Sequence, residues 1–453
     1  MRKSNLYFNR IGRDQISIAA DFKTFFDNIA IDNADTISMR YGEVTRALNM
    51  AFRNTDARNS NNLQVGSYGR WTAIKGISDL DMLYIMPEWT WDDYKDGGQA
   101  KLLRHAANAI KSRYPRTEVY PDTLVVVVEY ANFKIEVQPV FNDSHGHYLY
   151  PYARGVGGWR TTKPRPELDA TASLNRDTNG NLRRLAKMAR AWKNKHGVQM
   201  GGLLIDTLAH NYLRTTDQFD KTSFGACGNM IAGFLEFLAD QPDQDRYAAL
   251  GSGQHVKVKK KFQKKARKGA DIALRALEAG EGAAANNLWR ALLGRAFPYG
   301  ARSILLEKSY TAASGPMRTE EFIEDMFPVD IRYSLRLECE VTQDGFRAFL
   351  MRAARRLGGV KYIKREKMLR FYIESHTIKR DFDVYWKVLN RGPEAFRRDM
   401  VRGQIERGDP SKIEHSSFRG EHVVDCFAVQ NGVVVAKDRI HVPITDESEG
   451  GYG

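Results

Sequence analysis

The sequence of 453 residues lacks long apolar runs and contains only three cysteines. Its longest apolar run, residues 124–128, is far shorter than the roughly 20 residues that cross a membrane as a helix. The opening segment MRKSNLYFNRIG has no apolar stretch of the kind that directs secretion. Cys227, Cys339 and Cys426 are too widely separated for a disulfide framework or a zinc motif. These absences predict a cytoplasmic protein with reduced thiols and no membrane contact.

The charge is unbalanced, because 69 lysines and arginines against 55 aspartates and glutamates give a formal net charge of +14. Such an excess favours phosphate-bearing partners, such as nucleotides, nucleic acid or an anionic membrane surface, although it can also serve solubility alone. Residues 257–268 (KVKKKFQKKARK) concentrate eight basic side chains. This basic run is a candidate contact for nucleic acid, and the alternative is a solvated helix or loop.

The first 300 residues combine helical and strand patterns. Apolar residues recur at helical spacing from Ile37 to Phe52, with Asp35 available as the N-cap. Residues 79–86 and 123–129 are rich in strand-forming types, and residues 134–141 follow a short break, which predicts a hairpin beside the first strand. From Asn181 the period becomes helical. We therefore predict an α/β (α+β) core over residues 1–300, with a sheet lobe at about 55–145 and a helical lobe at about 165–300.

A different pattern begins beyond Gly315-Pro316. Apolar residues occupy every second position from Val329 to Val341, which is typical of a strand with one solvated face. Asn431-Gly432 lies between two apolar runs and is a strong signal for a type I′ hairpin. We therefore predict a β-rich, sandwich-like domain over residues 318–446. A linker at 301–317 precedes it, and a flexible polar tail at 447–453 follows it.

Two carboxylates dominate the chemistry of the predicted sheet. Asp79 and Asp81 are two residues apart on a strand, so both side chains leave the same face, roughly 6–7 Å apart along the backbone. Carboxylates held in this way repel one another unless a cation lies between them, and oxygen ligands favour magnesium or manganese. Upstream, Gly66 and Ser67 can form a tight turn whose amides and hydroxyl face a phosphate. Taken singly, each of these features also occurs at a solvated strand edge or in an ordinary turn.

A third acid and a basic helix extend this arrangement. Glu136 leaves the predicted hairpin on a polar face and can complete a three-carboxylate site for two metal ions beside the Asp79 strand. Lys187, Arg190 and Lys193 lie along the predicted helix from Asn181 and are candidates to neutralise a triphosphate. The alternatives are a surface glutamate and a solvated helix face.

The order of these motifs resembles a known family. GS, eleven residues, DLD and later IEVQPVF are similar to the signature of DNA polymerase β-type nucleotidyltransferases. The surrounding segments GSYGRWTAI, GGWRTTKPRPE, LRRLAKMARAWKNKHG and WRALLGRAFP narrow the resemblance to the cGAS/DncV-like nucleotidyltransferases and the related oligoadenylate synthetases. The likeness covers about residues 10–300. The chain lacks the Cys/His zinc insertion of cGAS, so activation by direct clamping of DNA is not expected.

This resemblance implies a fold and a set of residue roles. It implies a polymerase β-type lobe with a mixed sheet, joined to a helical lobe. By matching motif positions, the expected metal-binding acids are Asp79, Asp81 and Glu136. The expected triphosphate turn is Gly66 and Ser67. The helix that lines the nucleotide cleft carries Lys187, Arg190 and Lys193.

The C-terminal segments also resemble a known module. CEVTQDGFRAFLMRAARRLG, DVYWKVLNRGPEAFRRDMVRGQI, FRGEHVVDCFAVQNG and VVAKDRIHVPI are similar to the AGS-C sensor domain that is fused to such synthases. The resemblance implies a ligand-sensing role, with a nucleotide as a candidate ligand. Trp386, Lys387, Arg419 and Lys437 could stack on such a ligand and neutralise it. The alternative is that Trp386 is a core residue, because it shares a face with two valines of the same strand.

Three functional hypotheses follow. The leading one is a template-independent, magnesium-dependent enzyme that condenses nucleoside triphosphates into a cyclic or short linear oligonucleotide signal and releases pyrophosphate. The resemblance further implies a bacterial antiphage role with a neighbouring effector protein that the product controls. The second hypothesis is a toxin-like transferase that adds nucleotides to RNA ends or to a protein side chain. The third, an inactive nucleotide-sensing scaffold, is disfavoured because all three acids are present.

Overall fold

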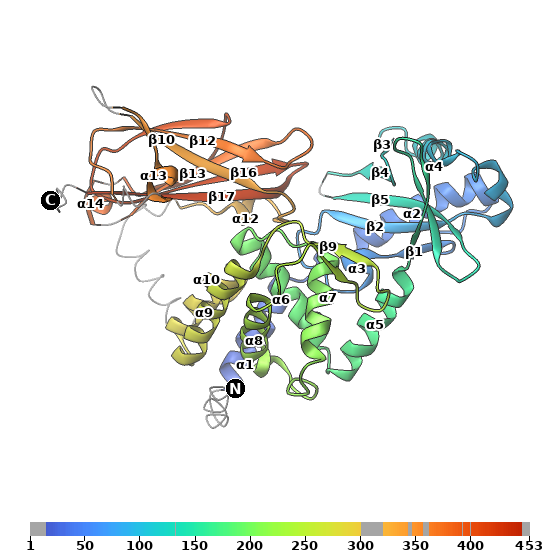
Figure 1. The fold of residues 1–453 in the computed structure, drawn as a ribbon, viewed down its shortest axis with the longest axis horizontal. Helices are drawn as coiled ribbons and strands as arrows, with labels where there is room; N and C mark the ends of the chain where they lie inside the picture. The colour runs from blue at the N-terminus through green and yellow to red at the C-terminus, as the bar shows by residue number, and fades with distance from the viewer. Residues whose placement is uncertain are drawn as a thin grey trace. The chain divides into compact units, whose positions relative to one another are not determined.

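The computed structural model describes residues 15–131, 133–299, 320–342, 347–356, 362–391, 393–398 and 400–445. The chain divides into two compact units, Met1–Ser303 and Ile304–Gly453, coloured blue to yellow and orange to red in Figure 1. The predicted linker at 301–317 and the predicted tail at 447–453 lie outside the described residues.

A mixed sheet forms one lobe of the first unit. Its strand order is β1-β2-β5-β4-β3, and β6 and β7 continue from β5. The strands are β1 (Asn62–Gln64), β2 (Asp79–Ile85), β3 (Glu118–Pro121), β4 (Val126–Glu129), β5 (Lys134–Asn142), β6 (Tyr148–Tyr152) and β7 (Gly158–Thr162). Only β2 and β5 pair in parallel, and the other neighbours are antiparallel. The predicted hairpin of β4 and β5 beside β2 is confirmed, as is the mixed sheet.

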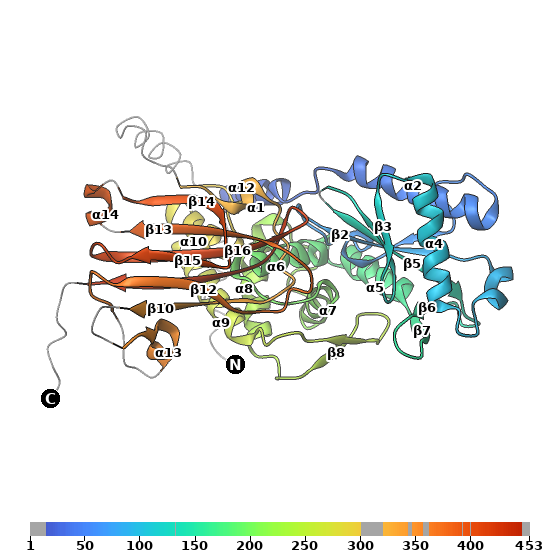
Figure 2. The same cartoon turned by 90° about the horizontal axis from the view of Figure 1, so that it is seen from above.

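Two helices, α2 (Ala34–Arg53) and α4 (Gln99–Arg113), cover one face of this sheet (Figure 2). Alternate residues of β2, such as Leu80 and Met82, join the buried cluster beneath these helices. The helix predicted between Ile37 and Phe52 is confirmed, but its N-cap residue is Asn33 rather than Asp35. The reason is that the first helical hydrogen bond runs from the amide of Ile37 to the carbonyl of Asn33, at 3.0 Å. The opposite face of the sheet is left to the polar residues of β2 and β5.

The other lobe of the first unit is helical. It comprises α1 (Gln15–Asn28), α5 (Pro164–Asp177), α6 (Asn181–His196), α7 (Gly202–Leu213), α8 (Cys227–Ala239), α9 (Gln263–Ala279) and α10 (Ala283–Leu293). The predicted apolar face of α6, which includes Trp192, is buried in a core that it shares with Trp289 of α10. Smaller elements connect these helices: α3 (Gly66–Gly69), η1 (Glu88–Asp93), η2 (Phe224–Ala226) and the hairpin of β8 (Arg246–Ala248) and β9 (His255–Lys257). None of the described helices is long and apolar enough to cross a membrane.

The second unit consists of two four-stranded sheets, ordered β11-β10-β12-β15 and β14-β13-β16-β17. The strands are β10 (Leu335–Thr342), β11 (Phe349–Leu350), β12 (Met368–His376), β13 (Asp383–Arg391), β14 (Arg402–Gly408), β15 (Ser411–His415), β16 (Gly420–Gln430) and β17 (Val433–Ile444). Short helices α12 (Ile323–Met326), α13 (Met351–Arg356) and α14 (Pro393–Arg397) accompany them. Inward residues of both sheets share one apolar core, so the predicted β-sandwich is confirmed.

Two local predictions in this unit have different outcomes. Asn431 and Gly432 both adopt positive φ, 51° and 71°, and join β16 to β17, which confirms the predicted hairpin turn. The strand predicted from Val329 begins only at Leu335. Val329 instead makes an isolated parallel bridge to Val434, and Ile331 lies in a separate small apolar cluster. The alternation therefore continues across two packing environments rather than along one strand.

Candidate active site

Three acidic side chains meet on the face of the sheet opposite α2 and α4. Asp79 and Asp81 lie on β2, and the parallel pairing of β2 with β5 places Asp81 directly beside Glu136. Neighbouring strands are about 4.8 Å apart, so these two carboxylates share one site. The backbone carbonyl of Asp81 accepts hydrogen bonds from the hydroxyl of Tyr41 at 2.9 Å and from the amide of Val65 at 3.2 Å. The structure thus brings together the three acids that the sequence singled out.

The electrostatic state of Asp81 reflects this crowding. Burial raises the pKa of the Asp81 carboxyl, the charges of Glu136 and Asp79 raise it further, and the resulting pKa is about 7. Arg70 and Lys134 act in the opposite direction, but they do not cancel the effect. A cation bound between these acids would therefore relieve a repulsion that the chain itself leaves in place.

The ammonium group of Lys134 lies between two of the acids. Its Nζ is 3.4 Å from Oδ1 of Asp79, and it also pairs with Glu136. Within the described residues, no set of three or more His, Cys, Asp or Glu side chains forms a ready-made metal cage. The acids nevertheless fit a divalent cation, because they are oxygen donors with an excess of negative charge that already attracts a positive group.

The turn at Gly66 and Ser67 packs directly against these acids. Gly66 begins α3 with φ of +65°, and a Cβ atom at this position would lie 1.9 Å from Oδ2 of Asp81. Only glycine therefore permits the turn to approach the carboxylate so closely. The carbonyl of Ser67 accepts hydrogen bonds from the amides of Thr72 and Ala73, at 3.0 and 3.1 Å, which closes the loop behind the turn.

The basic stripe of α6 contains residues with different environments. Arg190 is 6% exposed, and its guanidinium donates to Asp206 at 2.7 and 3.0 Å and to the carbonyl of Gly202 at 3.1 Å. Lys193 is also buried, at 7% exposure. The guanidinium of Arg190, predicted to face a phosphate, is instead committed to a carboxylate of the protein. The reason is that Arg190 has a tertiary partner, Asp206, which the sequence pattern could not reveal.

Lys187 differs from its neighbours. Burial lowers the pKa of its ammonium group, and the nearby charges of Arg183 and Arg190 lower it further. No carboxylate in the described part of the chain forms an ion pair with it. A half-buried lysine flanked by two arginines is a suitable partner for an anion, and Lys187 is therefore the strongest phosphate-binding candidate on α6.

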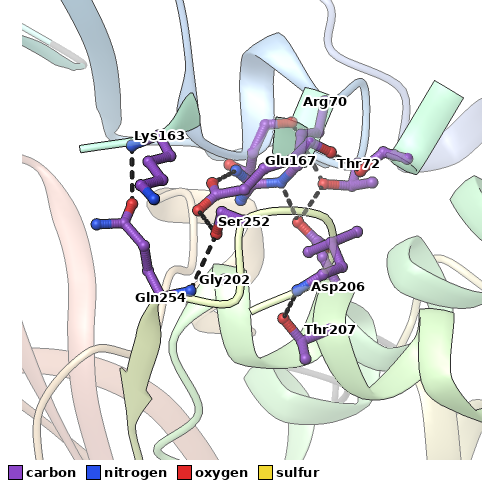
Figure 3. Close-up of polar contacts among 12 residues, drawn as sticks. Arg70, Thr72, Lys163, Glu167, Gly202, Asp206, Thr207, Ser252 and Gln254 are labelled. Atoms are coloured by element: carbon purple, nitrogen blue, oxygen red, sulfur yellow. Dashed lines mark hydrogen bonds and ion pairs between the residues drawn. The ribbon is translucent and has the colours of Figure 1, made fainter. Parts of the chain in front are cut away.

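Sequence analysis missed a buried polar network beside the turn, drawn in Figure 3. Oδ2 of Asp206 accepts hydrogen bonds from Nε of Arg70 at 2.7 Å and from the hydroxyl of Thr72 at 3.0 Å. Arg70 also lies 3.6 Å from Glu167. Two signals were available: Arg70 and Thr72 follow the GS turn, and Asp206 is the single acid in the apolar segment LLIDTLAHNYL.

The four predicted sensor residues of the second unit do not form one group. Trp386 is 2% exposed in the sandwich core, and its indole N–H donates to the carbonyl of Asp409 at 2.9 Å. This burial corrects the stacking role expected for Trp386 and matches the core alternative. Lys387 points to the other face and donates to Glu320 and to the carbonyl of Glu321, both at 2.7 Å. Arg419 is exposed before β16, whereas Lys437 is half-buried on β17.

The basic run at 257–268 comprises the end of β9, a loop and the beginning of α9. Part of its charge is used within the first unit. Lys261 pairs with Asp243, Arg267 lies 3.1 Å from Asp240, and Lys265 donates to the carbonyls of His196 and Gly197 at 2.6 and 2.9 Å. These contacts agree with the alternative of a solvated helix and loop, and they give no observation that favours nucleic acid.

The close approach of Gly66 to Asp81 leads to a testable prediction. We expect Gly66→Ala to lower the free energy of unfolding by about 2–4 kcal/mol, because it adds both positive-φ strain and a clash. Gly146→Ala is the matched control, since Gly146 has φ of +75° with no atom within 4 Å of its added Cβ. The control should lose only about 1 kcal/mol in chemical denaturation. Equal losses in the two variants would show that the contact with Asp81 is unimportant.

The position of Lys134 leads to a second prediction. In a buffer with a metal chelator, Lys134→Met should lower the melting temperature by a few degrees, equivalent to about 1 kcal/mol, because the acids lose their internal cation. Added Mg²⁺ should raise the melting temperature of the variant more than that of the wild type. Lys95→Met, which removes a surface pair with Asp92 at 2.7 Å, should show no such difference. Identical Mg²⁺ shifts in all three proteins would contradict the assignment of a cation site.

Comparison with known proteins finds a family match within each unit. Residues 16–175 match the family model of the Second Messenger Oligonucleotide or Dinucleotide Synthetase domain, SMODS. Residues 317–445 match that of the Adenylyl/Guanylyl and SMODS C-terminal sensor domain, AGS_C. The first match includes β2, β5 and the three acids, and the second covers the sandwich.

Individual proteins are also similar to this chain. The cyclic AMP-AMP-AMP synthase of Acinetobacter sp. (strain ATCC 27244 / 9458) is 23% identical over an alignment of 261 residues that covers 51% of this chain and 71% of the relative. Similar solved structures include CdnC of E. coli MS115-1 with ATP, at 12% identity over 63% of this chain and 99% of that chain, with a TM-score of 0.46. Another is the CD-NTase CdnG of Bradyrhizobium diazoefficiens with GTP. It is 13% identical over 64% of this chain and 97% of that chain, with a TM-score of 0.46. The chain therefore contains a SMODS match at residues 16–175 and an AGS_C match at residues 317–445, and together with the curated relative they support a nucleotidyltransferase of the cGAS/DncV-like type with a C-terminal AGS-C domain.

Proposed function

We propose that this nucleotidyltransferase condenses nucleoside triphosphates, without a template, into a cyclic or short linear oligonucleotide second messenger and releases pyrophosphate. The observation that carries the proposal is the parallel pairing of β2 with β5, which sets Asp81 beside Glu136 on the face that also carries Asp79. The Gly66–Ser67 turn against Asp81 supports it, because a triphosphate held at the turn would lie next to the acids.

The relatives support the same type of product. The SMODS family is described as a synthetase of second-messenger oligonucleotides or dinucleotides, and the Acinetobacter relative is a cyclic AMP-AMP-AMP synthase. We extend this to a role in antiphage defence, in which the product controls a neighbouring effector protein. In this proposal the AGS-C domain senses a ligand that governs the catalytic unit.

The acids define how the chain would hold its cofactor. Asp79, Asp81 and Glu136 would bind two Mg²⁺ ions, or Mn²⁺, which would polarise the phosphates and lower the pKa of the attacking hydroxyl. Lys134 would have to leave Asp79 and Glu136 as these ions bind, since its ammonium lies between them.

The reaction itself is a substitution at phosphorus. The hydroxyl oxygen of one nucleotide forms a bond to the α-phosphorus of another, while the bond from that phosphorus to the bridging oxygen breaks and pyrophosphate leaves. In this proposal Glu136 would help take the proton of the attacking hydroxyl, and its position on the strand next to Asp81 supports that role. Little covalent chemistry falls to the protein, so positioning and charge neutralisation account for most of the catalysis.

Two elements would hold the leaving group. The Gly66–Ser67 turn offers backbone amides and the Ser67 hydroxyl, and Lys187 offers an ammonium group that lacks an acidic partner in the described chain. A charge-assisted contact with phosphate would stabilise the charged ammonium of Lys187, which burial and the charges of Arg183 and Arg190 disfavour. Arg190 would contribute indirectly, through its bonds to Asp206 and Gly202.

The proposal is tested by supplying the purified chain with all four ribonucleoside triphosphates and Mg²⁺. We expect release of pyrophosphate and a small oligonucleotide that mass spectrometry identifies. Asp81→Asn and Glu136→Gln should each lower the rate at least about 1,000-fold, because they remove charge where the transition state requires it. Asp92→Asn, which alters an exposed acid of the sheet lobe, is the control and should retain full activity.

Other outcomes would redirect the proposal. Transfer of radiolabel from a triphosphate into tRNA or protein, with no small product, would replace oligonucleotide synthesis with the modification of a macromolecule. Full activity in Asp81→Asn would show that the three acids are not the catalytic centre.

Lys187 gives a separate prediction. Lys187→Met should weaken binding of a non-hydrolysable nucleoside triphosphate by about 10- to 100-fold, because one charge-assisted contact with phosphate contributes about 1.5–3 kcal/mol. Lys195→Met changes an exposed lysine of the same helix and should leave the affinity within about twofold, which matches a surface substitution. Isothermal titration of each variant measures the difference. Equal affinities of wild type and Lys187→Met would assign the phosphates to other residues.

A further inference from the structure

We infer that Asp206 is a positioning residue, which fixes the triphosphate turn at a set place relative to α6. This inference rests on the proposed function, because it assigns a role to a group that touches neither the acids nor the expected substrate. Asp206 is 1% exposed on α7, within a helix that is otherwise largely apolar. Figure 3 shows its carboxylate directed at the loop that follows the turn.

The carboxylate joins two parts of the lobe interface. From the loop after α3, it accepts hydrogen bonds from Arg70 at 2.7 Å and Thr72 at 3.0 Å. From α6, it accepts the bonds of Arg190 at 2.7 and 3.0 Å. Arg70 and Arg190 are themselves buried, at 4% and 6% exposure. A single acid therefore connects the phosphate turn of the sheet lobe with the basic helix of the helical lobe.

The link between this network and the turn is short. Thr72 bonds to Asp206 through its hydroxyl, and its backbone amide donates to the carbonyl of Ser67 at 3.0 Å. A Cβ atom at Gly202, the first residue of α7, would lie 3.2 Å from a terminal nitrogen of Arg190 and 3.9 Å from Cβ of Ser67. Displacement of Asp206 or its partners would therefore be transmitted to Ser67 through one residue.

The cations of α6 divide into two uses. Nε of Arg183 donates to the carbonyl of Arg70 at 3.1 Å, and Arg190 is bound to Asp206, so both arginines hold the loop. Lys187 lies between them on the same helix face and has no acidic partner within the described residues. The network thereby holds the turn and Lys187 at a fixed separation, and both are the proposed ligands of one triphosphate.

The backbone of the loop supplies an independent observation. Trp71 adopts φ of +63°, which is unfavourable for a bulky residue, and its side chain is 71% exposed. The residues on either side, Arg70 and Thr72, are the two that bond to Asp206. Strained conformations persist where the surrounding structure fixes them, and they occur most often at functional sites. The bonds of Arg70 and Thr72 to Asp206 therefore hold the loop in the conformation with positive φ at Trp71.

The charge balance also favours a positioning role. Burial alone would raise the pKa of Asp206, but the guanidinium groups of Arg190 and Arg70 outweigh it and hold the pKa below its usual value. Burying charged groups is costly, and well-packed apolar residues often stabilise a fold as well as a buried ion pair does. What the charges add is directional contact, since each bond fixes both a distance and an orientation.

The mildest test removes one hydroxyl. Thr72→Val keeps the shape of the side chain but deletes its bond to Asp206 at 3.0 Å and its longer contact with the carbonyl of Ser67 at 3.4 Å. We expect it to raise the KM for nucleoside triphosphate about 3- to 10-fold, with kcat changed less. The Kd of a non-hydrolysable triphosphate should rise by the same factor, while that of the free nucleoside should not change. Thr72→Ser should restore wild-type values because it restores the hydroxyl.

The matched control is Thr171→Val. Thr171 is 1% exposed on α5, and its hydroxyl bonds only to the carbonyl of Glu167 one turn earlier, at 2.7 Å. This variant loses a buried hydroxyl of the same unit but no contact with Asp206. We expect comparable loss of thermal stability in both valine variants and weaker triphosphate binding only in Thr72→Val.

A second variant, Asp206→Asn, keeps the size of the Asp206 side chain and removes its negative charge. We expect at least about 30-fold weaker triphosphate binding, because two buried charge-assisted pairs lose their acid. Wild-type triphosphate affinity in folded Thr72→Val and Asp206→Asn would overturn the positioning role and leave the proposed function intact. Absence of triphosphate binding by the wild type would overturn the proposed function, and the positioning role with it.

Discussion

The parallel pairing of β2 with β5 is the constraint on which the candidate site depends. It sets Asp81 beside Glu136, although 55 positions separate them in the chain. Side chains alternate along a strand, so a slip of one residue would turn Glu136 toward α2 and α4 and expose an apolar residue in its place. Leu80 and Ile135, which are fully buried beneath these helices, make such a slip costly. The apolar core on one face therefore determines the position of the charges on the other.

This dependence explains why the sequence predicted the acids well. Alternation within β2 and β5 is a local property, and it already places Asp79 and Asp81 on one face. The short break before β5 predicted the hairpin, and with it the convergence of Glu136 on β2. The hairpin turn at Asn431-Gly432 was predictable for the same reason, because the positive φ of both residues depends on their own residue types. Boundaries were less predictable. Asn33 rather than Asp35 occupies the N-cap position of α2, and β10 begins at Leu335 because Ile331 packs in another cluster.

Tertiary partners were not predictable, because residue type and spacing do not reveal them. Lys187 and Arg190 lie on one face of α6, yet Arg190 binds the acid of the next helix and Lys187 binds none in the described chain. A lone aspartate in an apolar helix signals a buried partner, but it does not identify Arg70, which lies 136 positions away. For Trp386, alternation favoured the core, and the second sheet of the sandwich provides the cover that the sequence could not show.

Asp81 and Asp206 have opposite electrostatic states, and this contrast distinguishes an acid suited to chemistry from an acid that holds the structure. Burial and the neighbouring carboxylates of Glu136 and Asp79 raise the pKa of Asp81, so its negative charge is undercompensated within the protein. Asp206 has two arginines, and its lowered pKa shows that the charge is satisfied within the protein. An undercompensated acid gains by binding an external cation, whereas a satisfied one gains nothing from a ligand and serves to hold its partners in place. Since the Gly66–Ser67 turn contacts the first acid directly and is connected to the second through Thr72, it lies where the reactive and the rigid parts of the unit meet.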